Sequence, residues 1–249
     1  MTEITSASNE LFKNWKNLDT AKGIRKAGAF FLMGEKLIQE FTANKDLQKR
    51  FPVQAEIVRE DLHPTGLAGA RSTFKLAKGL FNEIDFVGTH YNLLLLTLPE
   101  ISSFNKDTQP TGLELICPLG DPGNLGAVIR SALAFGASRV VLSEEAAFPF
   151  SPKVVKASAG AVLHMPISRG GNLQSFSGGE IYALDMVGSD IAQFKWPKNM
   201  RLLVGEEGSG LKDMKGLMKL KINTGTVESL NATVAASIAL YSYRNATQK

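Results

Sequence analysis

Three segments in the second half of the sequence combine polar side chains with glycine at spacings suited to ligand binding. The first places Asn124 and Arg130 on an amphipathic helical pattern over 124–135. Because helical side chains lean toward the N-terminus, the guanidinium of Arg130 can pass over Gly126 toward the preceding loop. This spacing predicts a fixed positive charge beside that loop, with an ordinary surface arginine as the simpler alternative. Asn124 is also a candidate N-cap of the helix.

The second segment has three glycines within residues 205–210, namely Gly205, Gly208 and Gly210. Glycines let the backbone approach a ligand closely and expose its amide groups, as in phosphate and nucleotide loops. The spacing matches neither the P-loop nor the dinucleotide fingerprint. Glu207 is therefore interpreted either as a carboxylate at a helix start or as a ligand for a hydroxyl or amine.

The third segment runs from Ile222 to Asn231 and leads into a helical pattern over 230–243 that is nearly all small or apolar. That composition predicts a buried helix. Ser229 and Asn231 stand at its entry. Capping explains one of them, whereas two polar groups beside a glycine-containing loop also suit hydrogen bonding to a ligand.

The elements that must position these residues alternate between strand and helix. Such alternation predicts a mostly parallel sheet covered on both faces, with ligands at the C-terminal ends of the strands. The expected strands are 113–119, 139–143, 161–167, 181–186 and 201–205, and the expected helices are 124–135, 152–158, 211–219 and 230–243.

The first half reads as a separate, smaller α/β domain. The polar, turn-forming stretch 99–112 is typical of a linker, so we expect domains at 1–105 and 106–249. Within the first domain we expect strands at 29–34, 53–58 and 91–98 and helices at 35–42 and 66–80.

Composition narrows the possible functions. The chain has 249 residues, 44% of them hydrophobic, one cysteine and three histidines. A lone Cys117 excludes an internal disulfide framework, and the scattered histidines argue against a metal site. With no signal-like or membrane-spanning segment in the sequence, we expect a cytoplasmic protein without a membrane partner. The net charge of +4 is a weak indication of a polyanionic partner.

In order, N-x-G-A-x-x-R, G-x-E-G-x-G-L and E-S-L-N-x-x-V-A-A resemble the three motifs of the SpoU (TrmH-type) RNA 2′-O-ribose methyltransferases of the SPOUT superfamily. Residues 30–34 likewise resemble the "FLVEG" segment of that family's RNA-binding domain, with Met33 in place of the acidic residue. The third motif departs from the family pattern, which usually has Pro-Met where Asn223 and Thr224 stand.

This resemblance implies an α/β protein with a trefoil-knotted, mostly parallel sheet, preceded by a small ribosomal-protein-like domain that binds the RNA substrate. It implies a metal-free homodimer that transfers a methyl group from S-adenosylmethionine to a ribose 2′-oxygen of structured RNA. The size of the N-terminal domain favours ribosomal over transfer RNA as the substrate. The implied catalytic set is Asn124, Arg130, Glu207, Ser229 and Asn231, and the implied cofactor-binding set is Gly205, Gly208, Gly210, Ile222 and Leu230.

Arginine is a poor base because it stays protonated at physiological pH. We therefore expect Arg130 to bind the adjacent RNA phosphate and to stabilise negative charge on the 2′-oxygen, while the proton passes to phosphate or water. Two other readings remain open. One is a non-catalytic RNA-binding or ribosome-assembly protein on the same fold, and the other is an unrelated nucleotide-binding α/β enzyme.

Overall fold

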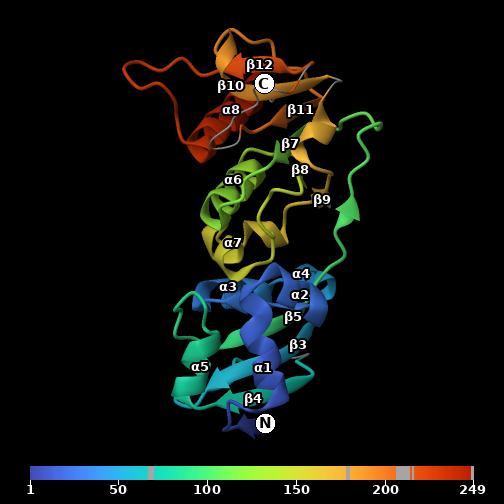
Figure 1. Cartoon of the computed structure of the whole chain (residues 1–249). Coiled ribbons are helices and arrows are strands. Elements are labelled where there is room, and N and C mark those ends of the chain that lie inside the picture. The colour runs from blue at the N-terminus through green and yellow to red at the C-terminus, as the bar shows by residue number, and fades with distance from the viewer. Residues whose placement is uncertain (67–69, 178–179, 206–213, 215, 248–249) are drawn as a thin grey trace. The chain divides into compact units, whose positions relative to one another are not determined.

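The computed structural model describes residues 1–66, 70–177, 180–205, 214 and 216–247. The chain forms two compact units (Figure 1). Unit 1 comprises Met1–Glu100 and Phe148–Leu163, and unit 2 comprises Ile101–Ala147 and His164–Lys249. The chain therefore leaves unit 2 after Ala147 to contribute one segment to unit 1.

Unit 1 is built on a mixed sheet of five strands in the order β1-β4-β3-β5-β2. The strands are β1 (Thr2–Ile4), β2 (Ala29–Met33), β3 (Val53–Arg59), β4 (Ser72–Leu76) and β5 (Leu93–Thr97). The helices are α1 (Glu10–Lys16), η1 (Asn17–Asp19), α2 (Ala21–Ala27), α3 (Glu35–Ala43), α4 (Lys45–Arg50), α5 (Lys78–Ile84), α7 (Pro152–Ala157) and η2 (Ala161–Leu163).

Most elements expected in the first half are confirmed, but the helix at 66–80 is wrong. Residues 72–76 form β4, which pairs in parallel with β3, and α5 begins only at Lys78. Pairing with a neighbouring strand therefore decides the conformation of residues 72–76, whatever their local helical pattern.

Four phenylalanine rings anchor the segment 148–163 in unit 1. The ring of Phe150 lies 4.9 Å from that of Phe30, 5.9 Å from that of Phe51 and 6.3 Å from that of Phe148, measured between centroids. Phe150 is almost fully buried. Aromatic packing of this kind supplies both apolar burial and favourable ring geometry. The segment thus belongs to the core of unit 1.

We expect Phe150→Ala to lower the free energy of unfolding of unit 1 by about 3–5 kcal/mol, because truncating a buried phenylalanine loses its transfer free energy and leaves a cavity. Urea denaturation followed by circular dichroism would measure it. Leu11→Ala, at a site that is 45% exposed, is the control and should cost less than about 1 kcal/mol. Equal losses in the two variants would contradict the role given to Phe150.

Unit 2 contains a seven-stranded sheet in the order β12-β10-β11-β7-β8-β9-β6, and every pair of neighbouring strands is parallel. The strands are β6 (Ser102–Ser103), β7 (Leu113–Cys117), β8 (Arg139–Leu142), β9 (Ile167–Arg169), β10 (Ile181–Asp190), β11 (Met200–Leu203) and β12 (Met218–Lys221). The helices are α6 (Pro122–Ala134), η3 (Leu173–Phe176) and α8 (Ala232–Thr247). The predicted α/β fold with a mostly parallel sheet is confirmed.

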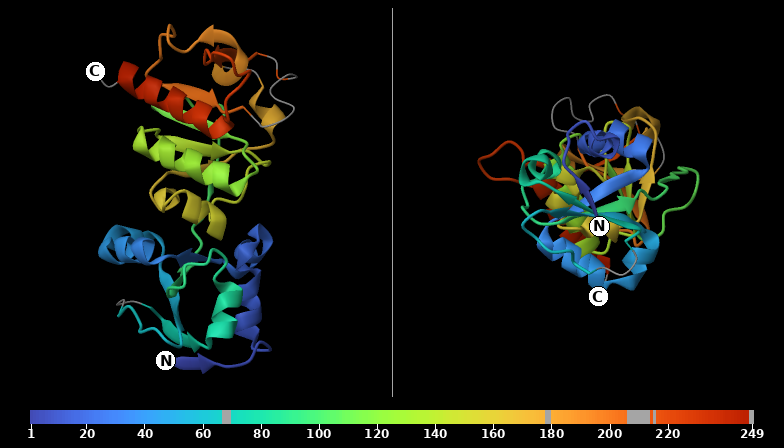
Figure 2. Two further views of the ribbon diagram at one scale, coloured as in Figure 1. Left: turned by 90° about the vertical axis from the view of Figure 1, so that its left-hand side faces the viewer. Right: turned by 90° about the horizontal axis from the view of Figure 1, so that it is seen from below.

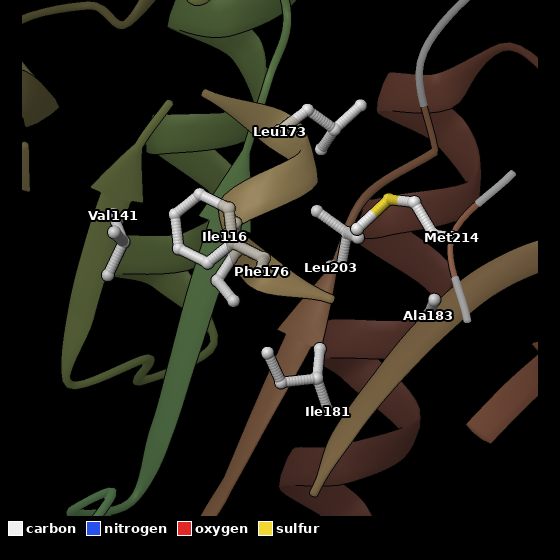
Figure 3. Packing of buried hydrophobic residues seen from close by; sticks show 8 residues of the cluster. All are labelled: Ile116, Val141, Leu173, Phe176, Ile181, Ala183, Leu203 and Met214. Atoms are coloured by element: carbon white, nitrogen blue, oxygen red, sulfur yellow. The ribbon is translucent and has the colours of Figure 1, made fainter. Parts of the chain in front are cut away.

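Both faces of the central strands are covered, since every residue of β7 and β11 is buried. A cluster that includes Ile116, Val141, Leu203 and Phe176 packs strand residues against η3 (Figure 3). Helices α6 and α8 lie side by side along the sheet (Figure 2). Cys117 at the end of β7 is buried, which raises the pKa of its thiol to about 12, so it is a protonated core residue at neutral pH.

Three local expectations in unit 2 are corrected. Residues 161–163 form η2 and β9 begins at Ile167, so the strand at 161–167 is wrong. Of the expected helix 211–219, residues 211–213 and 215 lie outside the described residues, and its last two residues belong to β12. The linker 99–112 contains β6, which pairs with β9. These short strands form because they pair with strands far away in the sequence. The local pattern of apolar residues therefore does not predict them.

Candidate functional site

A cavity of about 730 Å³ opens in unit 2 where β11 and β12 end, beside residues 184–186 of their neighbour β10. Its walls include Leu184 of β10, Val204 and Gly205 directly after β11, and Ile222 directly after β12. The carboxyl ends of parallel strands are the expected place for a ligand in such a sheet. The cavity has the size of a small-molecule site.

The structure brings together half of the residues expected to form the site. Gly205, Ile222, Ser229, Leu230 and Asn231 all line this cavity. Asn124 and Arg130 lie on α6 and are not among its lining residues. The remaining three, Glu207, Gly208 and Gly210, lie outside the described residues.

Gly205 stands where two strands approach closely. A Cβ atom at this position would lie 2.9 Å from the carbonyl oxygen of Leu184. Real Cβ atoms are almost never found so close to a backbone atom, so a side chain here would push β10 and β11 apart at the cavity wall. Glycine allows the two strands to keep their spacing. It also leaves the backbone at this position open to the cavity.

Helix α6 begins two residues earlier than the sequence indicated. Asp121, not Asn124, is its N-cap: the Asp121 Oδ1 atom accepts the Asn124 N–H at 2.8 Å, and Pro122 occupies the first helical position. At the other end Gly136 has φ +76°, as expected for a residue just past a helix. Asn124 is thus in the first turn, with its side chain not needed for capping.

Asn231 caps α8. Its Oδ1 atom accepts the N–H of Thr233 at 2.9 Å and that of Val234 at 3.4 Å, and its carbonyl oxygen accepts the N–H of Ala235 at 2.9 Å. Of the two polar residues at this helix entry, Asn231 is therefore the one that capping explains. Asn231 lines the cavity as well, so one residue joins the helix start to the cavity wall.

Helices α6 and α8 run side by side in the same direction. Thr233 Oγ1 lies 3.2 Å from Asn124 Oδ1, the hydroxyls of Ser131 and Ser237 are 2.8 Å apart, and Arg244 Nη1 donates to the Ala134 carbonyl at 2.7 Å. These contacts join the two helices from their first turns to their last, so α6 and α8 begin side by side. The first and third sequence motifs are thereby brought together where the two helices begin.

Arg130 is an exposed residue of α6, one position before Ser131. Within the part of the chain that the structure describes, its guanidinium has no hydrogen-bond or ion-pair partner. The cation is therefore not engaged by the protein's own carboxylates there. The direction of its side chain stays a prediction.

One face of α8 is exposed, contrary to the expectation of a wholly buried helix. Ala236, Ala239, Leu240 and Tyr243 are buried, whereas Val234, Ile238 and Tyr241 are solvent-exposed. Leu133 of α6 is exposed too, and the ring of Phe135 lies 5.7 Å from that of Tyr241. The two helices thus present an apolar surface.

The cavity also contains a carboxylate that the sequence analysis missed. Asp185 lies in the lining, and Lys219 Nζ is 2.8 Å from its Oδ2 atom. Burial alone would raise the pKa of Asp185, but the hydrogen bond from Lys219 and nearby backbone N–H groups hold that pKa below its usual value. Asp185 lies near the carboxyl end of the strand predicted at 181–186. An acidic residue at that end of a parallel strand was the sequence signal that could have identified it. The cavity wall thus carries an ionised carboxylate at neutral pH.

No metal cluster or membrane span is found in the described residues. They contain no group of three or more His, Cys, Asp or Glu side chains placed to hold a metal ion. None of the helices among them is long and apolar enough to cross a membrane.

Parallel α/β proteins commonly bind nucleotides and cofactors in a cavity of this size at the strand ends. The model of the SpoU rRNA Methylase family matches residues 115–241. The chain is 31% identical to the 23S rRNA (guanosine(2553)-2′-O)-methyltransferase RlmP of Bacillus subtilis, over 98% of this chain and 100% of that protein. The chain belongs to the SpoU rRNA methylase family.

Two further likenesses extend along nearly the whole chain. It is 37% identical to "Ribosomal RNA small subunit methyltransferase G 2" of Syntrophobacter fumaroxidans over 97% of this chain, but this match spans only 49% of that relative's length. The crystal structure of an AdoMet-bound rRNA methyltransferase from Sinorhizobium meliloti superposes with a TM-score of 0.77 at 25% identity, covering 98% of this chain and 97% of that one. Both units of the fold are therefore shared with that solved structure.

Proposed function

We propose that this protein transfers a methyl group from S-adenosylmethionine to the 2′-oxygen of a ribose in ribosomal RNA. The observation that carries the proposal is the cavity at the strand ends, which gathers Gly205, Ile222, Ser229, Leu230 and Asn231 from two separate motifs. RlmP, whose name describes 2′-O methylation of 23S rRNA, is similar along nearly the whole chain and supports the choice of reaction and substrate.

The cavity fits the methyl donor in size and chemistry. A volume of about 730 Å³ suits a ligand of this size, Leu184 and Leu220 offer apolar contacts for a base, and the Asp185 carboxylate can accept hydrogen bonds from hydroxyls. Main-chain N–H and C=O groups of Gly205 and Ile222 would form hydrogen bonds with the other polar groups of the methyl donor. When bound, S-adenosylmethionine supplies a methyl group made electrophilic by its sulfonium.

The chain's own residues have to orient the ribose and stabilise charge. Arg130 binds the adjacent RNA phosphate and stabilises negative charge developing on the 2′-oxygen, and the proton passes to phosphate or water. Asn124, Ser229 and Asn231 supply polar groups that fix the ribose and the donor relative to each other. Glu207 completes this set.

The active form is a homodimer. Each copy has a trefoil-knotted catalytic domain and a ribosomal-protein-like domain that binds RNA. The protein acts on RNA in the cytoplasm. The exposed apolar side chains Val234, Ile238, Tyr241 and Leu133 support association of two copies, because burying such a surface favours assembly. Sedimentation velocity on the purified protein tests the dimer, and a monomer at micromolar concentration would refute it.

Calorimetry separates this function from its alternative. We expect S-adenosylmethionine to bind with a micromolar dissociation constant and the protein to transfer labelled methyl groups to ribosomal RNA. Nuclease digestion and mass spectrometry should then recover a 2′-O-methylnucleoside. RNA binding without donor binding would instead support a non-catalytic RNA-binding or ribosome-assembly protein on this fold. Mapping ribose methylation in a deletion strain would identify the nucleotide.

A further inference from the structure

Unit 1 contains a second cavity, of about 540 Å³, between α1, η1, α2 and the strands β2, β3 and β5 of its sheet. The buried side chains of Trp15, Leu18 and Leu95 form its apolar floor. The wall made by α2 stands close to η1, because Gly23 has no side chain: a Cβ there would lie 1.8 Å from the Asn17 carbonyl oxygen. The close packing of α2 on η1 at the cavity wall therefore requires glycine at this position.

Basic residues are concentrated in this region, and the structure separates them into engaged and unengaged cations. Lys13 pairs with Glu10 and Lys16 with Glu83, each at 2.7 Å. The Arg25 guanidinium lies over the ring of Phe148, 4.9 Å from its centroid. These three cations are thus held by the protein itself.

Lys22 and Lys26 differ from those three. They lie four residues apart on α2, so they share one face of the helix, and both line the cavity. Among the described residues neither has a carboxylate oxygen within 4.0 Å, and the lining contains no Asp or Glu. The rim thus carries two lysines whose charge the described protein does not neutralise.

Three amide side chains add hydrogen-bonding capacity. The amide nitrogen of Asn17 donates to the Lys13 carbonyl at 2.9 Å and that of Gln54 to Thr97 Oγ1 at 3.2 Å. Within the described chain, the side-chain oxygens of both residues and the whole side-chain amide of Asn14 have no hydrogen-bond partner. Unpaired bases are recognised through such donors and acceptors on their edges, together with apolar or aromatic contacts.

We propose that this cavity binds one unpaired nucleotide of the RNA substrate, with the base on the floor formed by Trp15 and Leu18 and the phosphates against Lys22 and Lys26. The site is formed by residues of unit 1 alone and binds RNA without taking part in methyl transfer. This inference rests on the proposed RNA substrate.

Charge reversal at the rim tests the proposal in the full-length protein. Lys22→Glu with Lys26→Glu should weaken binding of a ribosomal RNA hairpin with an unpaired loop by at least ~10-fold. Each lost phosphate contact should make the logarithmic salt dependence shallower by about 0.7. The methyl-transfer KM for that RNA should rise, while the dissociation constant of S-adenosylmethionine stays unchanged. Lys36→Glu with Lys49→Glu, on exposed positions of unit 1, makes the same charge change outside the cavity and is the matched control.

A spectroscopic readout locates the nucleotide independently. The chain has two tryptophans, so Trp196→Phe leaves Trp15 as the reporter, and thermal unfolding confirms that each variant is folded. We expect the looped hairpin to quench Trp15 fluorescence and a fully paired duplex of equal length not to. Equal quenching by the duplex, or saturable quenching by a free nucleoside monophosphate but not by the hairpin, would overturn the proposal.

The outcomes distinguish this inference from the proposed function. If the charge-reversed protein binds RNA as tightly as its control while the wild type methylates RNA, the inference fails and the function stands. If the wild type transfers no methyl group but its RNA binding still depends on Lys22 and Lys26, the proposed function fails and the inference stands.

Discussion

Replacing Arg130 with lysine is expected to lower the turnover of methyl transfer at least ~100-fold, the scale of removing one electrostatic stabiliser of a transition state. Lysine keeps the positive charge but loses the planar fork that binds phosphate through two hydrogen bonds. Because Arg130 is exposed on α6, lysine at this position should leave the fold and its stability essentially unchanged. Single-turnover assays with ribosomal RNA would measure it.

Arg244→Lys provides the matched control for this experiment. Arg244 is an exposed arginine of the adjacent helix α8 and donates to the Ala134 carbonyl. Its replacement should leave turnover within a factor of about two, because lysine keeps the charge and an N–H donor for the Ala134 carbonyl at an exposed position. Near-normal turnover of Arg130→Lys would show that the bidentate guanidinium is not needed, and the role given to it would be wrong.

Replacing Asn231 with aspartate is expected to lower turnover about 100-fold while leaving the protein folded. Aspartate retains an oxygen that can accept the Thr233 N–H and is as good an N-cap as asparagine. It lacks the amide donor, whose loss from an active site typically costs 10²–10³-fold, that is about 3–4 kcal/mol of transition-state stabilisation. Turnover should therefore fall in this variant, while the free energy of unfolding measured by urea denaturation stays unchanged.

Two further variants make the result specific. Asn231→Ala should lose activity and also about 1 kcal/mol of stability, because it removes the cap of α8. Asn172→Asp makes the same chemical change at the N-cap of η3, where the side chain accepts the Ser175 N–H at 3.0 Å outside the cavity lining. It should keep full activity. Undiminished turnover in Asn231→Asp would reduce Asn231 to a helix cap.

The sequence by itself determined the elements whose signals are local. The amphipathic pattern of α6 and the glycine after it, the apolar runs of β7 and β11, and the capping residue before α8 all lie within a few residues of the element they specify. The sequence also identified four site residues, because a motif at a strand end can be recognised without knowing which residues pack beside it. These are Gly205, Ile222, Ser229 and Leu230. These residues line one cavity, as their common place after parallel strands led us to expect.

Only the tertiary structure decided the features that depend on distant partners. Strand β12 exists because it pairs with β10, residues 148–163 join unit 1 because Phe150 packs against Phe30 and Phe51, and Asp185 meets Lys219 across two strands. The charges of the N-terminal helices are a further example. Lys16 is neutralised by Glu83, which lies far away in the sequence, so the sequence alone does not show which basic residues are paired. The physical reason is that strand pairing, core packing and ion pairs depend on residues brought together from tens of positions away, and local periodicity carries no record of them.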